Sequence, residues 1–278
     1  MIARTTGSTH MNAQKLIREK CDIREGVRVL RRRCPVLKAM HDRAGEPPLR
    51  RYPADFSGLA RIIVGQQLSI ASAAAIWARL QKALGRVTAR SLTEADDATL
   101  VDAGLSGAKV RTLRALANAV LKQPPVNAQQ NGSSSSKLKP ASLAIAKLIN
   151  ATDDEVRDAL TAVHGIGPWT ADIFIMFCLG RADAWAAGDL ALQVGVARAF
   201  ALGDRVSANE TLAIAERWRP WRGVAARLIW ADYKNLRDIK PEAAAKSPNV
   251  TSKAKHVDSS KKSGRQKTNN ATTEVIDE

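Results

Sequence analysis

Residues 164–172, His-Gly-Ile-Gly-Pro-Trp-Thr-Ala-Asp, place two glycines and a proline directly before an apolar segment. Glycine reaches backbone angles that other residues resist, and it leaves the backbone amides uncovered. Pro168 suits the first position of a helix, where its missing N–H would have had no partner. Uncovered amides at the start of a helix bind phosphate oxygens. The spacing therefore predicts a phosphate-binding turn between two helices.

Two further positions have both a chemical and a structural interpretation. Asp189 precedes the apolar segment 190–200, and aspartate is among the best residues for capping the start of a helix. From the residues alone, the cap is the favoured interpretation of Asp189. A second glycine-bearing turn, residues 103–109, precedes an arginine-rich helix and fits either another phosphate site or a helix end capped by Gly104, which is favoured.

The elements that must position these residues are predicted to be helices throughout. Apolar residues recur at spacings of three and four and no alternating run occurs, so we expect an all-α fold. The expected helical segments are a short arginine-rich helix at 27–40, then 59–84, 108–121, 141–149, 153–163, 169–180, 190–200, 208–218 and 221–235. We expect a helical domain over 26–242, a disordered or loosely structured N-terminus at 1–25, a flexible insertion at 122–140 and a disordered basic tail at 243–278.

Charge narrows the class of partner. The 278 residues include 43 Lys and Arg against 27 Asp and Glu, a net charge of +16. Such an excess favours a polyanion, either nucleic acid or an acidic membrane surface. No apolar run approaches the roughly 18–20 residues needed to cross a bilayer, and no signal peptide is evident, so we expect a cytoplasmic protein, or a nuclear one in a eukaryote. Three cysteines are too few for a disulfide framework or a four-cysteine metal site.

Four segments, in order along the chain, carry a family resemblance. They are residues 63–69, residues 163–171 followed by Asp189 after an Ala-Gly step, residues 218–222 and residues 227–230. Together they resemble the helix-hairpin-helix (HhH-GPD) DNA glycosylase superfamily, closest to its alkylation-repair branch, that of DNA-3-methyladenine glycosylase II. The resemblance implies two helical subdomains flanking a cleft for DNA and a flipped base. It also implies base excision repair by hydrolysis of the N-glycosidic bond of alkylated purines, of the 3-methyladenine and 7-methylguanine type.

The same resemblance implies the chemistry of the site. Asp189 stabilises the oxocarbenium-like sugar and activates the attacking water. Trp169 stands where bifunctional relatives carry a lysine, so the implied enzyme is monofunctional and has no lyase activity. Trp169 and Trp230 line the base pocket together with Ile173, which replaces a tyrosine of some relatives.

The resemblance also implies how DNA is held. Gln66 or Gln67 fills the gap left by the flipped nucleotide, with Gln67 favoured, although a plain polar helix turn is the alternative for this pair. The hairpin residues expected to bind a DNA phosphate are His164, Gly165, Ile166 and Gly167. Candidate phosphate partners elsewhere are Lys109, Arg198 and Arg222.

The expected partner is damaged double-stranded DNA, bound by a monomer. No cofactor and no catalytic metal are expected, and the resemblance implies at most a structural Na⁺ or K⁺ at the carbonyls of Val163 and Ile166. Structural roles are expected for two aspartates and four tryptophans: Asp172, Asp183, Trp77, Trp185, Trp218 and Trp221. The alternatives for function are a non-catalytic helix-hairpin-helix DNA-binding protein, or a glycosylase for deaminated or oxidised bases.

Overall fold

The computed structural model describes residues 14–121 and 143–238. Within these ranges the chain forms helices joined by short connections, and the β-type pairing there is an isolated antiparallel bridge between Leu16 and Arg181. The all-α prediction is confirmed. None of the helices in these ranges is long and apolar enough to cross a membrane. The expected insertion at 122–140 and the expected tail at 243–278 lie outside the described residues.

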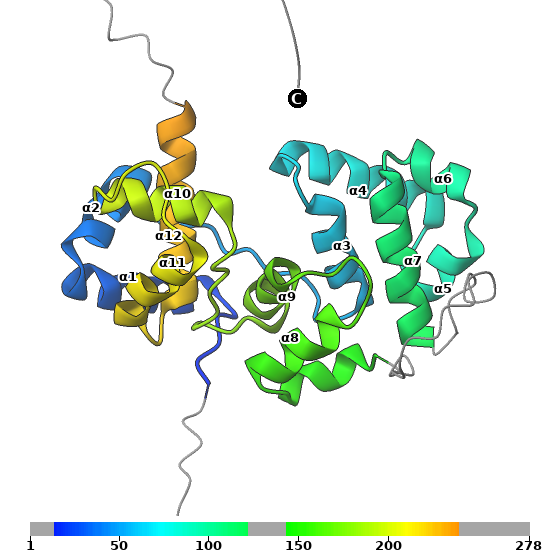
Figure 1. Cartoon of the computed structure of the whole chain (residues 1–278), viewed down its shortest axis with the longest axis horizontal. Helices are drawn as coiled ribbons and strands as arrows, with labels where there is room; N and C mark the ends of the chain where they lie inside the picture. The colour runs from blue at the N-terminus through cyan, green and yellow to red at the C-terminus, as the bar shows by residue number, and fades with distance from the viewer. Residues whose placement is uncertain (1–13, 122–142, 239–278) are drawn as a thin grey trace, which may run out of the picture. The chain divides into compact units, whose positions relative to one another are not determined.

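The helices form two subdomains (Figure 1). We call the first the terminal subdomain; it consists of α1 (Lys20–Arg33), α2 (Pro35–Ala44), α10 (Leu190–Ala199), α11 (Ala208–Ala215), the 3₁₀ turn η3 (Glu216–Trp218) and α12 (Arg222–Asp238). The central subdomain consists of α3 (Phe56–Gly65), α4 (Ile70–Leu84), α5 (Ala89–Glu94), α6 (Asp97–Asp102), α7 (Gly107–Leu121), the 3₁₀ turn η1 (Ile145–Asn150), α8 (Asp153–Thr161), α9 (Pro168–Phe174) and the π-helical turn η2 (Ile175–Leu179). Helix α12 packs on α1, α2 and α10, whereas α3 packs on α4, α7 and α9.

The terminal subdomain begins earlier than the sequence predicts. The expected boundary at residue 26 lies inside α1, which starts at Lys20. Ile17, ahead of that helix, is fully buried, and its backbone N–H donates to the carbonyl of Gly180 over 2.6 Å. Residues that looked loosely structured are therefore tied to the connection that leads back from the central subdomain.

The arginine-rich segment forms two helices rather than one. Pro35 begins α2, and Cys34 before it takes extended angles, φ −140° and ψ 104°. A residue that precedes proline disfavours the helical region, which explains the break. Both helices pack on α12, so the segment completes the core of the terminal subdomain.

The predicted helix at 59–84 is also divided. Helix α3 ends at Gly65 and α4 begins at Ile70, where the side chain of Ser69 accepts the N–H of Ser72 over 3.1 Å and caps the new helix. The intervening turn contains Gln67 at φ +56°, a left-handed conformation that favours glycine. The glutamine pair thus lies on a turn between two helices and not within a polar helical stretch.

Several smaller differences concern the ends of elements. Helices α5 and α6 were absent from the expected set, and the segment expected as a helix at 141–149 contains the 3₁₀ turn η1. Gly104 has φ +99° and its N–H donates to the carbonyl of Val101, directly after α6. The second glycine-bearing turn is therefore a helix end, as favoured from the sequence.

Helices α10 and α12 approach closely at Gly195. A Cβ atom added there would lie 2.4 Å from Cγ2 of Ile229 on α12. Gly107, the first residue of α7, is different, because its nearest neighbour would be the flexible guanidinium of Arg111 at 3.4 Å.

We expect Gly195→Ala to lower the free energy of unfolding by up to about 2 kcal/mol, since overpacking costs roughly 1–3 kcal/mol and alanine recovers about 1 kcal/mol of helix propensity. Urea denaturation measures this loss. Gly107→Ala is the matched control and should leave stability unchanged or slightly raised. An equal loss in both variants would mean that the α10–α12 approach is not tight.

Candidate functional site

The side chain of Asp189 is held by three N–H donors. Its Oδ1 accepts the backbone N–H of Leu192 over 3.0 Å, which caps α10, and also the indole Nε1–H of Trp230 over 2.9 Å. Its Oδ2 accepts the indole Nε1–H of Trp169 over 2.9 Å. The two interpretations of Asp189 are thus compatible, because the cap and the indoles together fix the direction of one carboxylate.

The three donors come from both subdomains. Trp169 lies in the first turn of α9, in the central subdomain, whereas Trp230 on α12 and Leu192 on α10 lie in the terminal subdomain, as does Asp189 itself. Asp189 is half-buried, so its carboxylate is ordered without being sealed from solvent. The structure therefore brings together three residues that the sequence analysis assigned to catalysis and to the base pocket.

Asp189 differs from the buried aspartates Asp172 and Asp232 in that no cation pairs with it among the described residues. Asp172 is paired with Arg157, with Nε–H to Oδ1 at 2.7 Å, and Asp232 accepts two hydrogen bonds from Arg43 at 2.9 Å. Asp189, in contrast, has neutral donors alone among the described residues. Its negative charge is oriented but not neutralised, which suits a carboxylate that must face a developing positive charge.

The remaining aspartate assignments are structural. Burial raises the pKa of Asp172, and the ion pair with Arg157 opposes that rise. Asp183 pairs with Arg222, with Nε–H to Oδ1 at 3.0 Å, and also with Arg219. The structural roles expected for both aspartates agree with these contacts.

Arg222 was expected to contact phosphate, and this prediction is wrong. Its side chain is buried, donates to both oxygens of Asp183 and also pairs with Glu216 over 2.9 Å. A guanidinium engaged by two carboxylates beneath the surface has no charge left for DNA. Arg198, by contrast, is exposed, with its Cζ 5.7 Å from the ring centroid of Tyr233.

The six tryptophans divide into two groups. Trp77, Trp185, Trp218 and Trp221 are buried in the core, as expected. Trp169 and Trp230 are half-buried and are the ones that donate to Asp189. The N–H groups of these two indoles therefore position the carboxylate of Asp189.

Behind Trp230 lies an aromatic and cationic cluster that sequence reasoning missed. The ring of Phe177 lies 5.8 Å from that of Trp230 and 6.2 Å from that of Tyr52. The guanidinium carbons of Arg227 and Arg50 lie 4.8 Å and 5.5 Å from the same Phe177 ring. Phe177 follows Ile173 by four residues in an apolar helical run, and this i, i+4 spacing is the signal that could have found it.

Ile173 was expected to line the base pocket. It lies in α9, one helical turn after Trp169, and its side chain is 6% exposed. Because so little of its side chain is exposed, Ile173 can contribute only a small apolar area to a base pocket.

The two glutamines have different roles in the structure. Gln66 is half-buried and its Nε2 donates to the hydroxyl of Thr170 on α9 over 2.8 Å. Gln67 is exposed and has the left-handed backbone described above. Gln66 therefore ties the turn to the hairpin, while Gln67 is the side chain free to project.

Lys109 supports this turn from the side of α7. Its Nζ donates to the carbonyl of Val64 over 2.7 Å, in the last turn of α3, and burial lowers its pKa. A lysine at the end of a helix satisfies a carbonyl that lacks an intrahelical partner. Lys109 was expected to contact a DNA phosphate. In the structure its ammonium group instead contacts a backbone carbonyl of the protein.

The hairpin connects α8 to α9 through residues 162–167. Gly165 has φ +82°, and a Cβ there would lie 2.0 Å from Oγ1 of Thr112, whereas a Cβ on Gly167 would meet nothing within 4 Å. The backbone N–H groups of these two glycines have no hydrogen-bond partner within residues 14–121 and 143–238. The N–H of Ile166 donates to the carbonyl of Val163 over 3.1 Å, so this part of the expected hairpin is used internally. The expected cation at these carbonyls stays a prediction.

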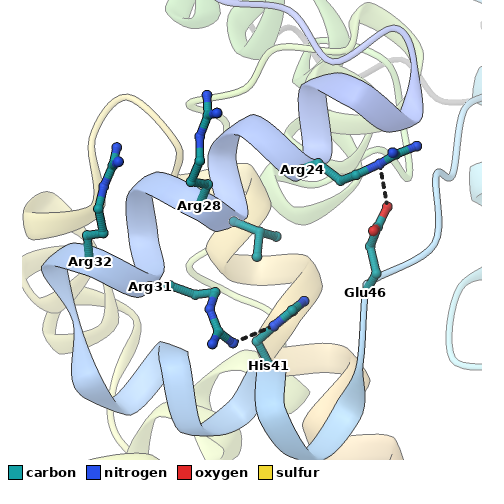
Figure 2. Close-up of a pocket in the computed structure, with 7 residues that line it drawn as sticks. Arg24, Arg28, Arg31, Arg32, His41 and Glu46 are labelled. Carbon is teal, nitrogen blue, oxygen red and sulfur yellow. Dashed lines mark hydrogen bonds and ion pairs between the residues drawn. The ribbon is translucent and has the colours of Figure 1, made fainter.

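A pocket of about 360 Å³ lies elsewhere, at α1 and α2 (Figure 2). It is lined by Arg24, Val27, Arg28, Arg31, Arg32, His41 and Glu46. Arg31 donates to Nδ1 of His41 over 2.6 Å and Arg24 pairs with Glu46 over 3.4 Å. Figure 2 shows Arg28 and Arg32 directed away from these pairs. The guanidinium groups do not converge, so we do not assign a ligand to this pocket.

The fold and the hairpin define the class. Residues 60–220 match the HhH-GPD superfamily of base excision DNA repair proteins. The chain belongs to this superfamily.

Individual relatives agree with the family. The YfjP protein of Bacillus subtilis is 32% identical over 88 residues, which cover 32% of this chain and 31% of the relative, about a third of its length. The crystal structure of DNA-3-methyladenine glycosidase from Bacillus halodurans is similar with 28% identity and a TM-score of 0.58, over 77% of this chain and 91% of that one. The structure of Schizosaccharomyces pombe 3-methyladenine DNA glycosylase Mag1 in complex with abasic DNA has 23% identity and a TM-score of 0.57, over 69% and 88%, and supports the shared fold.

The two hairpin glycines give a matched pair of substitutions. Gly165→Ala should lower the free energy of unfolding by about 2–4 kcal/mol, because alanine resists positive φ and collides with Thr112. Gly167→Ala should change stability by less than about 1 kcal/mol, since no atom opposes its Cβ. Urea titration of both variants compares them. Similar losses would indicate that the hairpin does not depend on the Gly165–Thr112 contact.

Proposed function

We propose that the protein is a monofunctional DNA glycosylase that removes alkylated purines of the 3-methyladenine and 7-methylguanine type from double-stranded DNA. The observation that carries this proposal is the carboxylate of Asp189, oriented by two indole N–H groups and not neutralised by a cation. Membership of a base excision repair superfamily and the likeness to the B. halodurans glycosidase support it. The net charge of +16 supports a DNA partner.

In the proposed reaction, the bond between the purine nitrogen and the anomeric carbon breaks and its electron pair leaves with the base. Positive charge then develops on the sugar, as in glycoside hydrolysis in general. Asp189 stabilises that charge and orients a water, which attacks the anomeric carbon and transfers its proton to the carboxylate. The product is an abasic site.

No covalent intermediate is needed in this scheme. A lyase reaction requires an amine that attacks the sugar. Where bifunctional relatives carry a lysine for this step, this chain has Trp169, whose indole has no nucleophilic amine. In the described part of the chain, no lysine hydrogen-bonds to Asp189. The DNA strand is therefore expected to remain intact after base release.

The base must first leave the duplex, which costs a few kcal/mol. We infer that Gln67 fills the resulting gap, because its side chain is exposed on a strained turn while Gln66 is bound to Thr170. The unpaired amides of Gly165 and Gly167 are proposed to hold a phosphate of the same strand. Such contacts do not depend on base sequence.

Replacement of the carboxylate tests the chemistry. Asp189→Asn should reduce base release from duplexes with 7-methylguanine by at least about a hundredfold, a typical effect of losing one electrostatic group at a transition state. The amide nitrogen also cannot accept an indole N–H, so the geometry is perturbed as well. Single-turnover assays of base release measure the rate. Asp204→Asn, on an exposed loop, is the matched control and should behave as wild type.

The outcomes separate the alternatives. Equal release by wild type and Asp189→Asn would exclude Asp189 as the catalytic residue. Tight, salt-sensitive binding with no base released from any lesion would indicate a non-catalytic DNA-binding protein. If only deaminated or oxidised bases are released from a panel of lesions, the substrates are those bases and not alkylated purines.

The projecting glutamine has its own test. Gln67→Ala should slow base release by about tenfold, because the vacated space in the duplex is no longer filled and the flipped state is less populated. A 2-aminopurine next to the lesion reports unstacking directly, and its fluorescence change should shrink in parallel. Gln81→Ala, exposed near the far end of α4, is the control. Unchanged fluorescence in Gln67→Ala would assign the role to another side chain.

A further inference from the structure

Arg227 is a buried cation with no counter-ion among residues 14–121 and 143–238. It is 4% exposed, and its guanidinium donates to the carbonyls of Gly223 over 2.7 Å and Met176 over 3.3 Å. Its Nε has no hydrogen-bond partner, and no salt bridge within the described residues includes it. The other buried arginines, Arg181 and Arg222, are each paired with an aspartate.

This arginine is charged at neutral pH. Burial lowers the pKa of Arg227 to about 9, with further contributions from the nearby cations Arg50 and Arg51. A pKa of about 9 still leaves nearly every molecule protonated at pH 7. A positive charge thus lies in the protein interior next to two more, with no carboxylate bound to it.

The position of this charge relates it to the proposed base pocket. Arg227 precedes Trp230 by three residues on α12, so both side chains point to the same side of the helix. Both contact Phe177, with Arg227 Cζ 4.8 Å and the Trp230 ring 5.8 Å from its ring centroid. Arg50 is half-buried, its Cζ 5.5 Å from the same ring. Two guanidinium groups therefore stand against the ring that backs the pocket wall.

We propose that Arg227 and Arg50 determine the charge preference of the base pocket, by penalising a base that carries positive charge and favouring a neutral modified purine. The inference rests on the proposed function and refines its substrate class. Cationic alkylpurines remain substrates because alkylation itself weakens their glycosidic bond. The pocket, however, contributes more binding to neutral lesions such as hypoxanthine.

Two physical effects support this preference. A buried charge is screened poorly, and a unit charge acting across roughly 10 Å at an effective dielectric constant of about 20 changes the occupancy of a cationic base by about tenfold. In addition, an aromatic face attracts cations, and the face of Phe177 is already occupied by guanidinium groups. The ring is therefore not available to attract a cationic base.

The test compares two lesions in the same enzyme. Duplexes with one 7-methylguanine, which is cationic, or one hypoxanthine, which is neutral, are incubated with full-length wild type, Arg227→Met and Arg50→Met under single-turnover conditions. The measured quantity is the ratio of the 7-methylguanine rate to the hypoxanthine rate. Both the intrinsic lability of the lesion and any general loss of activity cancel when variant ratios are divided by the wild-type ratio.

We expect the ratio to rise by about tenfold in Arg227→Met and by a smaller factor in Arg50→Met, which is more exposed. Arg217→Met is the control, since Arg217 also lies on a phenylalanine ring, 5.3 Å from the centroid of Phe200, and that ring packs on Trp218 rather than on Trp230. Its ratio should equal that of wild type. If Arg227→Met fails to fold, as judged by its thermal unfolding, Arg50→Met alone decides the question.

The contrary outcomes are distinct. An unchanged ratio in folded variants, or an equal fall in both rates, would overturn the charge preference and leave the proposed function intact. An equal rise of the ratio in Arg217→Met would assign the effect to net charge rather than to these two residues. Failure of wild type to release either base would overturn the proposed function itself.

Discussion

The site depends on one shared carboxylate. Asp189 connects the two subdomains because it accepts an indole N–H from α9 and another from α12 while it caps α10. Hydrogen bonds to a carboxylate are stronger than neutral ones, yet neutral donors leave its net charge intact. A salt bridge would have held the subdomains equally well, but it would have cancelled the charge that the proposed chemistry needs.

Helix α7 contacts both the end of α3, next to the glutamine turn, and the glycine hairpin. Lys109 binds the carbonyl of Val64, just before the glutamine turn, and Thr112, three residues later, lies against Gly165 of the hairpin. The hydrogen bond from Gln66 to Thr170 joins the glutamine turn to α9, the helix that follows the hairpin. A displacement of α7 would move the turn and the hairpin together. The glutamine turn and the hairpin of the central subdomain are therefore coupled through α7.

The sequence predicted the fold, but not the hydrogen bonds that join Asp189, Trp169 and Trp230. The three- and four-residue spacings located most of the helices, and Pro35 and the Gly65–Ser69 turn divided two of them at positions where local chemistry allows a break. Trp169 and Trp230 lie 20 and 41 positions away from Asp189 in the sequence, so no local sequence pattern contains these contacts. Family resemblance named the residues without describing those hydrogen bonds.

Arginine was the residue type most difficult to interpret from sequence. Arg222 looked like a phosphate partner, yet it closes an ion pair with Asp183 beneath the surface. Arg227, five residues later on the same helix, has no carboxylate partner in the part of the chain that the structure describes. Whether a basic residue contacts DNA, packs in the core or lies at a pocket depends on which carboxylates lie next to it in the folded protein. The sequence alone does not show those neighbours.

The distribution of paired and unpaired charge gives the site its electrical asymmetry. Among the carboxylates, Asp172, Asp183 and Asp232 are matched by arginines, while Asp189 is not. Among the buried cations, Arg227 is the counterpart of Asp189, since it too has no ion-pair partner in the described part of the chain. In the proposed complex with DNA, the unmatched anion at the start of α10 and the unmatched cation on α12 would produce a field between the sugar and the base. The anion favours positive charge on the sugar, and the cation favours electron density on the departing base. Both tendencies act in the direction in which a glycosidic bond breaks.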